Sequence, residues 1–159
     1  MSAVIENDNY SAVMSSLGAE LKSLKDAKTG REYLWQADPA WWKGSAPLLF
    51  PIVGGLRNGK YRYEGVEYEL PQHGFARTAE FRQCAAAGDA AEFELGSNAD
   101  TMAKYPFEFR LRVGFALPTN TLVYATGGIA YGKFKNSFAT TNGFNTFTQT
   151  ERTERDRGW

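Results

Sequence analysis

An alternating segment at residues 60–70 constrains the fold of this chain more than any other feature. It reads Lys-Tyr-Arg-Tyr-Glu-Gly-Val-Glu-Tyr-Glu-Leu, so apolar and polar residues alternate on both sides of Glu64 and Gly65. Alternation with a period of two predicts half-buried strands, and the glycine predicts the turn of a hairpin between them. The covered face of the hairpin is expected to hold Tyr61, Tyr63, Val66, Tyr68 and Leu70.

Other segments extend the strand pattern along the chain. Residues 91–95 and 107–113 also alternate, and an apolar run at 48–53 leads through an Asn-Gly turn into the hairpin. The leucine spacing in residues 16–27 suits either a helix or a strand, and the strand is preferred. Aromatic residues make up 14% of the chain and 16 glycines supply turns, which favours strands over a helical bundle. We predict an all-β fold, an antiparallel β-sandwich that is incomplete.

Charge and residue counts exclude several functions. The chain has 18 basic and 18 acidic residues, so it lacks the bulk positive charge with which many proteins bind nucleic acid. Its one cysteine, Cys84, and one histidine, His73, exclude a disulfide framework, a thiolate zinc cluster and a multi-histidine metal site. We therefore expect no metal and no other cofactor.

The sequence also carries no recognisable membrane or export signal. The first ten residues contain acids instead of a basic start followed by an apolar run. No apolar stretch approaches the roughly 20 residues of a membrane helix. The expected location is cytoplasmic, and no membrane partner is expected.

Composition changes near Val113. Residues 1–113 contain 13 basic and 15 acidic groups, a net charge of −2, whereas residues 114–159 contain 5 and 3, a net charge of +2. Three threonines occur up to Val113 and nine among the last 46 residues. We place a domain boundary here, so that residues 1–113 form the sandwich part and residues 114–159 a second group of strands.

The second group has its own expected elements. Residues 121–126 and 129–134 are predicted strands, separated by a break at Gly127 and Gly128. Both strands are expected to pair with the preceding sheet. The charged end has no apolar periodicity, so the residues beyond about 149 are expected to be mobile.

Four blocks, in this order, carry a resemblance to a known family. They are Gly30-Arg-Glu-Tyr-Leu-Trp35, Phe50-Pro-Ile-Val-Gly-Gly-Leu-Arg-Asn-Gly-Lys-Tyr61, Glu69-Leu-Pro-Gln-His-Gly-Phe-Ala-Arg77 and Tyr105-Pro-Phe-Glu-Phe-Arg110. Over about residues 4–113 the chain resembles the aldose 1-epimerase (galactose mutarotase-like) family, in particular its branch of hexose-6-phosphate epimerase relatives. The resemblance implies the amino-terminal part of a large β-sandwich that interconverts the α and β anomers of a sugar.

The tail, residues 114–159, carries a different resemblance. Its Gly-Gly-Ile-Ala-Tyr-Gly stretch at residues 127–132 is similar to a strand, turn and strand of small outer-membrane β-barrel proteins. We therefore interpret the chain as a chimera or a truncated family member. A barrel fragment is the least favoured function, because two or three strands cannot close a barrel in lipid. The exposed strand edges of an incomplete sandwich favour self-association.

His73 is the candidate catalytic residue. Anomer exchange requires a base for the proton of the anomeric hydroxyl and an acid for the ring oxygen, and imidazole suits such proton exchange near neutrality. From the residues alone, His73 is either a structural histidine or a sugar contact. By resemblance it matches the first of two family histidines, which lines the sugar site. The second histidine and a glutamate base lie farther along the family's chain, and this sequence has no second histidine, so turnover is expected to be impaired.

Three other side chains in the matched blocks are candidate substrate contacts. Arg57 and Arg77 carry guanidinium forks that can bind sugar hydroxyls or a phosphate, or else form surface ion pairs. Gln72 is a weaker candidate for a sugar hydroxyl. The expected partner is a small sugar or sugar phosphate.

Two further groups bear on the function. Trp35, Trp41 and Trp42 are either core residues, which is preferred, or a stacking platform for a pyranose. Gly54 and Gly55 are not a phosphate loop, since the lysine and hydroxyl pattern of such a loop is missing. The predicted function is an aldose 1-epimerase-like isomerase acting on a hexose or hexose 6-phosphate, with impaired turnover. The alternative is a non-catalytic carbohydrate-binding β-sandwich.

Overall fold

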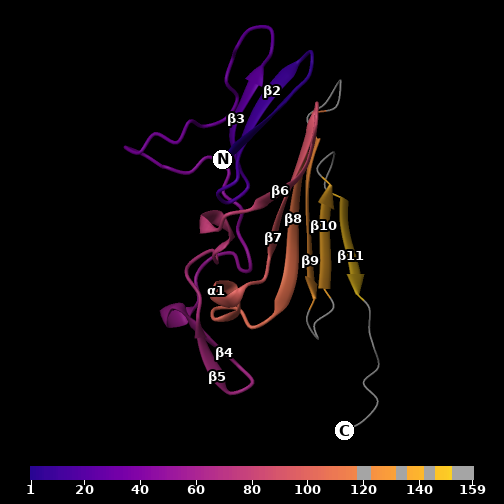
Figure 1. Ribbon diagram of the computed structural model, residues 1–159. Helices are drawn as coiled ribbons and strands as arrows, with labels where there is room; N and C mark the ends of the chain where they lie inside the picture. Colours follow the sequence, from indigo (N-terminus) through magenta and orange to yellow (C-terminus); the bar gives the residue numbers. More distant parts are fainter. Residues whose placement is uncertain (118–122, 132–135, 142–145, 152–159) are drawn as a thin grey trace.

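The structure, a computed structural model, describes residues 1–117, 123–131, 136–141 and 146–151. Strands dominate this part of the chain and form three antiparallel sheets (Figure 1). The first has the order β1-β2-β3, with β1 Ser2–Glu6, β2 Tyr10–Ser15 and β3 Glu20–Asp26. The second is a two-stranded hairpin of β4 Lys60–Tyr63 and β5 Val66–Glu69.

The third sheet has the order β11-β10-β9-β8-β7-β6. Its strands are β6 Arg82–Ala87, β7 Ala90–Gly96, β8 Glu108–Ala116, β9 Val123–Tyr131, β10 Asn136–Thr141 and β11 Thr146–Glu151. Short turns of helix connect these elements: η1 Arg57–Gly59, η2 Ala76–Thr78 and α1 Ala99–Met102. None of the helices within the described ranges is long and apolar enough to cross a membrane.

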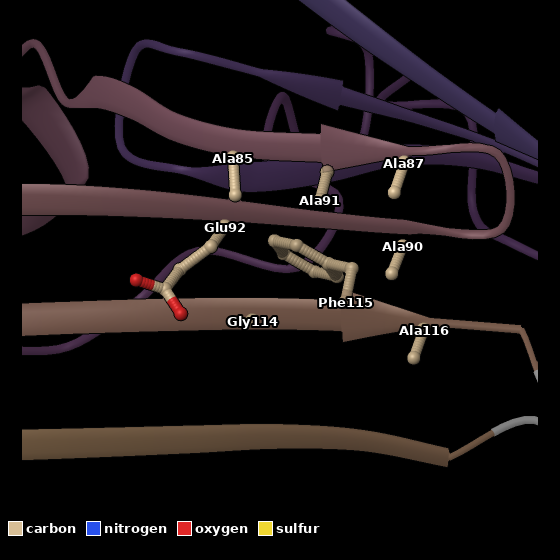
Figure 2. Close-up of a pocket in the computed structure, with 8 residues that line it drawn as sticks. All are labelled: Ala85, Ala87, Ala90, Ala91, Glu92, Gly114, Phe115 and Ala116. Carbon is tan, nitrogen blue, oxygen red and sulfur yellow. The ribbon is translucent and has the colours of Figure 1, made fainter.

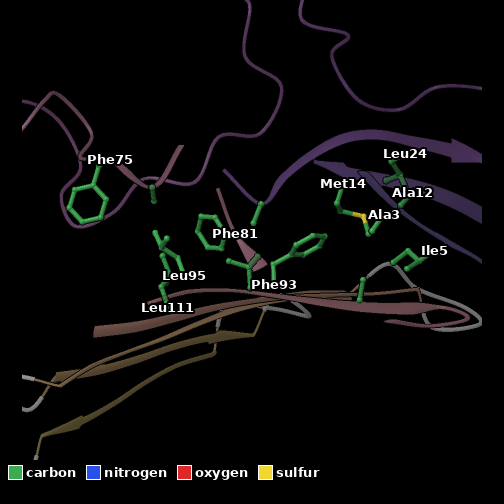
Figure 3. Close-up of a cluster of buried hydrophobic side chains, with 14 of the residues drawn as sticks. Ala3, Ile5, Ala12, Met14, Leu24, Phe75, Phe81, Phe93, Leu95 and Leu111 are labelled. Atoms are coloured by element: carbon green, nitrogen blue, oxygen red, sulfur yellow. The ribbon is translucent and has the colours of Figure 1, made fainter. Parts of the chain in front are cut away.

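The core lies between the first sheet and one face of β7 and β8. Alternate residues of these two strands point inward and are buried: Ala91, Phe93, Leu95, Phe109, Leu111 and Val113. Ile5 and Met14 from the first sheet lie opposite this face, and Phe81 packs between the two layers (Figure 3). The two facing sheets confirm the predicted all-β, antiparallel sandwich.

The other face of the same strands is charged. Glu94 accepts hydrogen bonds from Arg82 and Arg112, both at 2.8 Å, and Arg110 lies 3.6 Å away. The hydrogen bond from Arg112 is the main cause that lowers the pKa of the Glu94 carboxyl. This alternation of apolar and charged residues fixes which face of the sheet packs inward, because a shift by one residue would bury the charges.

The hairpin confirms the turn at Glu64 and Gly65, which have φ values of 47° and 81°. Positive φ at both central residues is the geometry of a tight hairpin turn. Tyr61 and Tyr68 face each other across the strands with their rings 5.4 Å apart. The expectation that Val66 lies on the covered face of the hairpin is wrong, because this residue is 53% exposed. Val66 follows the turn at the projecting end of the hairpin, beyond the main body of the molecule (Figure 1).

The other strand predictions have mixed outcomes. Residues 16–27 contain β3, which confirms the preference for a strand. The predicted break at Gly127 and Gly128 is wrong, because β9 runs through both glycines and pairs them with Arg112 and Leu111 of β8. Glycine keeps its backbone donor and acceptor, so the ladder continues through it.

β9 pairs with β8, as expected for the tail, and β11 continues to Glu151. Residues 121–122 and 132–134 of the predicted strands lie outside the described residues, as does the end from residue 152. β8 crosses the suggested boundary at Val113 without interruption. The division into two domains stays a prediction.

Candidate functional site

A contact between two distant segments assembles the candidate site. Phe50 forms an isolated parallel bridge with Gly74. Its carbonyl oxygen accepts hydrogen bonds from the backbone amides of Phe75, at 2.9 Å, and Ala76, at 3.2 Å. The segment after Phe50 is therefore held against the segment that contains His73.

Aromatic packing anchors this contact to the core. The ring of Phe50 lies 5.9 Å from Phe75, 5.0 Å from Phe109 and 6.0 Å from Tyr105, measured between ring centroids. Phe109 belongs to the inward face of β8. The position of the site is thus set by the same core that holds the sheets together.

His73 is fixed by two hydrogen bonds to a single residue. Its backbone amide donates to the carbonyl oxygen of Gly54 at 2.7 Å, and the amide of Gly54 donates to Nδ1 of the imidazole at 2.9 Å. The ring is half-buried, and its second nitrogen, Nε2, has no partner among the described residues. Both segments of the site thus contribute to holding the imidazole.

Gln72 and Arg77 lie on the same segment as His73. Arg77 donates from Nη2 to the backbone oxygen of Gln72 at 3.1 Å, which ties the two ends of this turn together. The side chain of Gln72 is exposed and lies beside Gly55, where an added Cβ would be 3.8 Å from its Cγ. The structure therefore brings Gln72, His73 and Arg77 together with the pair Gly54 and Gly55.

Arg57 begins η1, three residues after Gly54. Its side chain is exposed and forms no hydrogen bond or ion pair with the described residues. The surface ion pair that was the alternative for Arg57 is therefore not formed within this part of the chain. The guanidinium is available to a ligand.

The tryptophans are not core residues, so that expectation is wrong. Trp41 is 82% exposed, Trp42 51% and Trp35 43%. Trp35 donates from its indole to the backbone oxygen of Trp42 at 2.7 Å. All three lie in the long loop between β3 and η1, and part of this loop extends away from the sheets (Figure 1).

Among the described residues, no carboxylate bonds to the imidazole ring of His73. Both hydrogen bonds of His73 go to the main chain of Gly54. Within the same residues, no group of three His, Cys, Asp or Glu side chains is placed to hold a metal ion. The chemistry that remains for His73 is hydrogen bonding or proton exchange at Nε2.

A hollow of about 330 Å³ lies elsewhere, over β6, β7 and β8. Its walls are alanines, Gly114 and Phe115, with Glu92 as the one ionisable side chain among the residues that line it (Figure 2). None of the predicted site residues lines this hollow. The hollow is therefore separate from the candidate site at His73.

The sequence motif found the histidine but missed its partner. Gly54 and Gly55 lack the sequence pattern of a phosphate loop, and nothing local in the sequence connects them with His73. The sequence signal that could have indicated Gly54 is the glycine pair itself. Gly54 adopts a φ of 85°, which few residues other than glycine tolerate.

Comparison with known proteins matches these residues to a family. The profile described as Aldose 1-epimerase matches residues 1–144, which is most of the chain and extends beyond the fourth block. The chain belongs to the aldose 1-epimerase family. The family resemblance of residues 4–113 is thereby confirmed.

Individual relatives agree with this assignment. Protein LacX (plasmid) from Lactococcus lactis subsp. lactis is 38% identical over 122 residues, which are 74% of this chain and 40% of the relative. The structure of a galactose mutarotase related enzyme from Lactobacillus acidophilus has a TM-score of 0.81 at 38% identity, covering 89% of this chain and 48% of that one. A galactose mutarotase-like protein from Lactobacillus casei has the same TM-score and the same coverage at 31% identity. The chain therefore spans less than half the length of these relatives.

Proposed function

We propose that the segment around His73 binds an aldose, either a hexose or a hexose 6-phosphate, as part of an aldose 1-epimerase-type isomerase. The observation that carries the proposal is the clamp formed by the two hydrogen bonds between His73 and Gly54. This clamp leaves Nε2 of the half-buried imidazole without a partner among the described residues. Family membership supports a small sugar as the ligand class. Gln72 and Arg77, which lie on the same turn, are the proposed contacts to sugar hydroxyls.

The chemistry of anomer exchange assigns His73 one of two roles. Opening the ring requires that the anomeric hydroxyl lose a proton while the ring oxygen gains one. Rotation about the bond between C1 and C2 and ring closure then give the other anomer. A positioned acid or base contributes typically about 10²- to 10⁴-fold to the rate. His73 provides one such group in this chain.

We expect this chain alone to accelerate mutarotation little. It contains a single histidine, and no carboxylate bonds to that histidine within the described residues. An acid without its matching base leaves about 10²- to 10⁴-fold of the acceleration unrealised. Binding depends on fewer groups than turnover and is expected to persist.

A non-catalytic carbohydrate-binding protein is the second candidate. The same absence of a carboxylate beside His73 in the described part favours it. The measurable difference from an impaired isomerase is the rate of mutarotation, which a pure binding protein does not change.

Polarimetry together with a binding titration tests the proposal. Freshly dissolved D-glucose and D-galactose are followed by optical rotation, with and without the protein, and binding is measured by NMR titration. The matched variant is His73→Asn, because asparagine tolerates the φ of 67° at this position better than alanine does.

Each result bears on one part of the proposal. Millimolar sugar binding that His73→Asn weakens, with little or no rate increase, supports the site and the missing base. A strong acceleration that His73→Asn abolishes would show that the acid–base set is complete after all. If neither binding nor acceleration occurs, the sugar site itself is refuted.

A further inference from the structure

We infer that the backbone amide of Gly54 fixes His73 in the tautomer that carries its proton on Nε2, so that this nitrogen presents a hydrogen-bond donor to the sugar. This inference rests on the proposed sugar site and specifies the role of the histidine in it. Gly54 is a positioning residue, since it acts on the ligand through His73.

The donor role of Nε2 follows from the hydrogen-bonding capacity of the two nitrogens in a neutral imidazole. One ring nitrogen carries a proton and the other carries a lone pair. The amide of Gly54 donates to Nδ1 at 2.9 Å, so Nδ1 must hold the lone pair. The proton therefore resides on Nε2, and the hydrogen bond made by one nitrogen determines the state of the other.

This assignment restricts what His73 can do to a sugar. A protonated Nε2 has no lone pair in the plane of the ring, so it cannot take the proton of the anomeric hydroxyl. It can donate a hydrogen bond to the ring oxygen, where negative charge develops as the bond between C1 and that oxygen breaks. The base must then be supplied by another group.

The clamp also sets the orientation of the ring before a ligand arrives. The backbone amide of His73 returns a hydrogen bond to the carbonyl of Gly54 at 2.7 Å, so the same two residues are joined twice. A donor that is already oriented loses less conformational freedom when the ligand binds. The effect on affinity thus depends on the direction of the Gly54 amide.

That direction is sensitive to the residue at position 54. Gly54 has a φ of 85°, and an added Cβ would meet no atom within 4 Å. An alanine there has room for its side chain but strains the backbone, which rotates the peptide away from Nδ1. The neighbouring Gly55 has no such φ, and its added Cβ would make an ordinary contact at 3.8 Å with Gln72. Gly55→Ala is therefore the matched control for Gly54→Ala.

NMR of the ¹⁵N-labelled protein tests the clamp directly, because His73 is the only histidine in the sequence. The spectra are recorded at mildly alkaline pH. We expect Nδ1 to resonate as an unprotonated nitrogen and Nε2 as a protonated one. We also expect a ¹⁵N–¹⁵N coupling across the hydrogen bond between the Gly54 amide and Nδ1. A fold that merely placed the two residues near each other would not give this coupling.

The variants connect the clamp to the ligand. Gly54→Ala is expected to lose the coupling and to bind D-galactose about 3- to 10-fold more weakly, the usual range for losing one neutral hydrogen bond worth about 1 kcal/mol. Gly55→Ala is expected to keep the coupling. Gly96→Ala at the end of β7, where an added Cβ meets no atom within 4 Å, is expected to keep the binding. The titration of the wild type with D-galactose is expected to shift Nε2 more than Nδ1.

The outcomes separate this inference from the proposed function. A missing coupling, or a proton on Nδ1, overturns the role of Gly54 even if the sugar binds at His73. An intact coupling with no response to D-galactose, D-glucose or glucose 6-phosphate refutes the sugar site, and with it the donor role. The coupling together with a sugar-dependent shift at Nε2 supports both.

Discussion

Gly74 lies directly against the backbone carbonyl of Phe50, with no space for a side chain between them. An added Cβ at Gly74 would overlap the carbonyl oxygen and carbon of Phe50 and lie 2.6 Å from Cδ of Pro51. Gly74 also has a φ of 71°. The residue after His73 thus has to be a glycine for the two site segments to meet.

Gly74→Ala is expected to be strongly destabilising and to separate the two segments. Overlap with fixed backbone costs about 1–3 kcal/mol, and the left-handed backbone adds about 1–2 kcal/mol for a residue with a Cβ. Urea denaturation followed by circular dichroism measures the loss. The control is Gly96→Ala, where an added Cβ meets no atom within 4 Å. Equal stability of the two variants would contradict the close contact.

Glu20 fastens the tryptophan-containing loop to β3. Its carboxylate accepts hydrogen bonds from the backbone amides of Ser45 at 2.7 Å and Ala46 at 3.0 Å, and Lys22 lies 3.0 Å away. Burial opposes the charged form, but the amide of Ser45, Lys22 and the amide of Ala46 outweigh it and lower the pKa of Glu20 below 4.5. The folded state therefore prefers the ionised carboxylate.

Glu20→Gln is expected to lower the free energy of unfolding by about 1 kcal/mol near neutral pH, because charge-assisted hydrogen bonds are roughly twice as strong as neutral ones. Since the folded-state pKa is lowered, this stabilisation is complete above the unfolded value of about 4.5 and is lost as the pH falls through the folded value. Urea midpoints of wild type and variant at about pH 7 and pH 3 measure the change. The exposed Glu108, which forms no ion pair within the described ranges, provides Glu108→Gln as the control. A difference that does not shrink at the lower pH would contradict the role of the charge.

The sequence predicted the features of the fold that depend on neighbours along the chain. The hairpin at residues 60–70 was recognisable because period-two alternation and a turn glycine are local signals. Whether a strand residue is covered depends on what packs over it, so the exposure of Val66 was missed. The tryptophans at 41 and 42 show the same limit, since their apolar rings predict burial while the loop that carries them lies outside the sheets.

The site was predictable to a similar extent. His73, Gln72 and Arg77 lie in one motif and therefore appeared together. The partner of His73 did not, because the hydrogen bond from Gly54 crosses 19 sequence positions and comes from a backbone amide, which every residue except proline possesses. Gly127 and Gly128 were misinterpreted for a related reason, since a glycine pair looks like a break when the neighbouring strand that pairs with it is unknown.

Tyr61 provides a test at alkaline pH. Burial, with smaller effects from Tyr105 and Tyr68, raises the pKa of the Tyr61 hydroxyl to about 12. The hydroxyl donates to the backbone oxygen of Lys104 at 2.8 Å, which joins the hairpin to the segment after α1. Because the folded-state pKa is raised, the stabilisation is complete below the unfolded value of about 10 and is lost as the pH rises through about 12.

Tyr61→Phe is expected to cost about 1 kcal/mol of stability, for one neutral hydrogen bond. It is also expected to reduce the late part of the tyrosinate absorbance titration, to which Tyr105 and Tyr63, whose pKa values are also raised, contribute. Tyr68→Phe is the control, since it keeps the stacked ring and its hydroxyl makes no hydrogen bond within the described residues. Loss of an early step near pH 10 in Tyr61→Phe would contradict the raised pKa.

Arg57 is the residue expected to distinguish a phosphorylated sugar from a free one. Arg77 already uses its guanidinium to hold the backbone of Gln72, whereas Arg57 is exposed and has no partner among the described residues. A guanidinium binds a phosphate through two parallel hydrogen bonds, which are among the strong ones because both groups are charged. We therefore expect Arg57 to bind the phosphate, while Arg77 holds the turn through one nitrogen and contacts sugar hydroxyls with its other donors.

Arg57→Gln is expected to weaken binding of glucose 6-phosphate about 10- to 100-fold, since hydrogen bonds to charged groups are worth about 1.5–3 kcal/mol. Binding of glucose is expected to change little. The control is Arg62→Gln on β4, because Arg62 is also exposed but lies 3.9 Å from Glu67 and is partly neutralised by it. Titrations of both sugars at low and high salt measure the effect, and the contribution of Arg57 is expected to fall as salt screens the charges. An equal loss for glucose and glucose 6-phosphate would instead assign Arg57 to a sugar hydroxyl, because only a contact to the phosphate separates the two ligands.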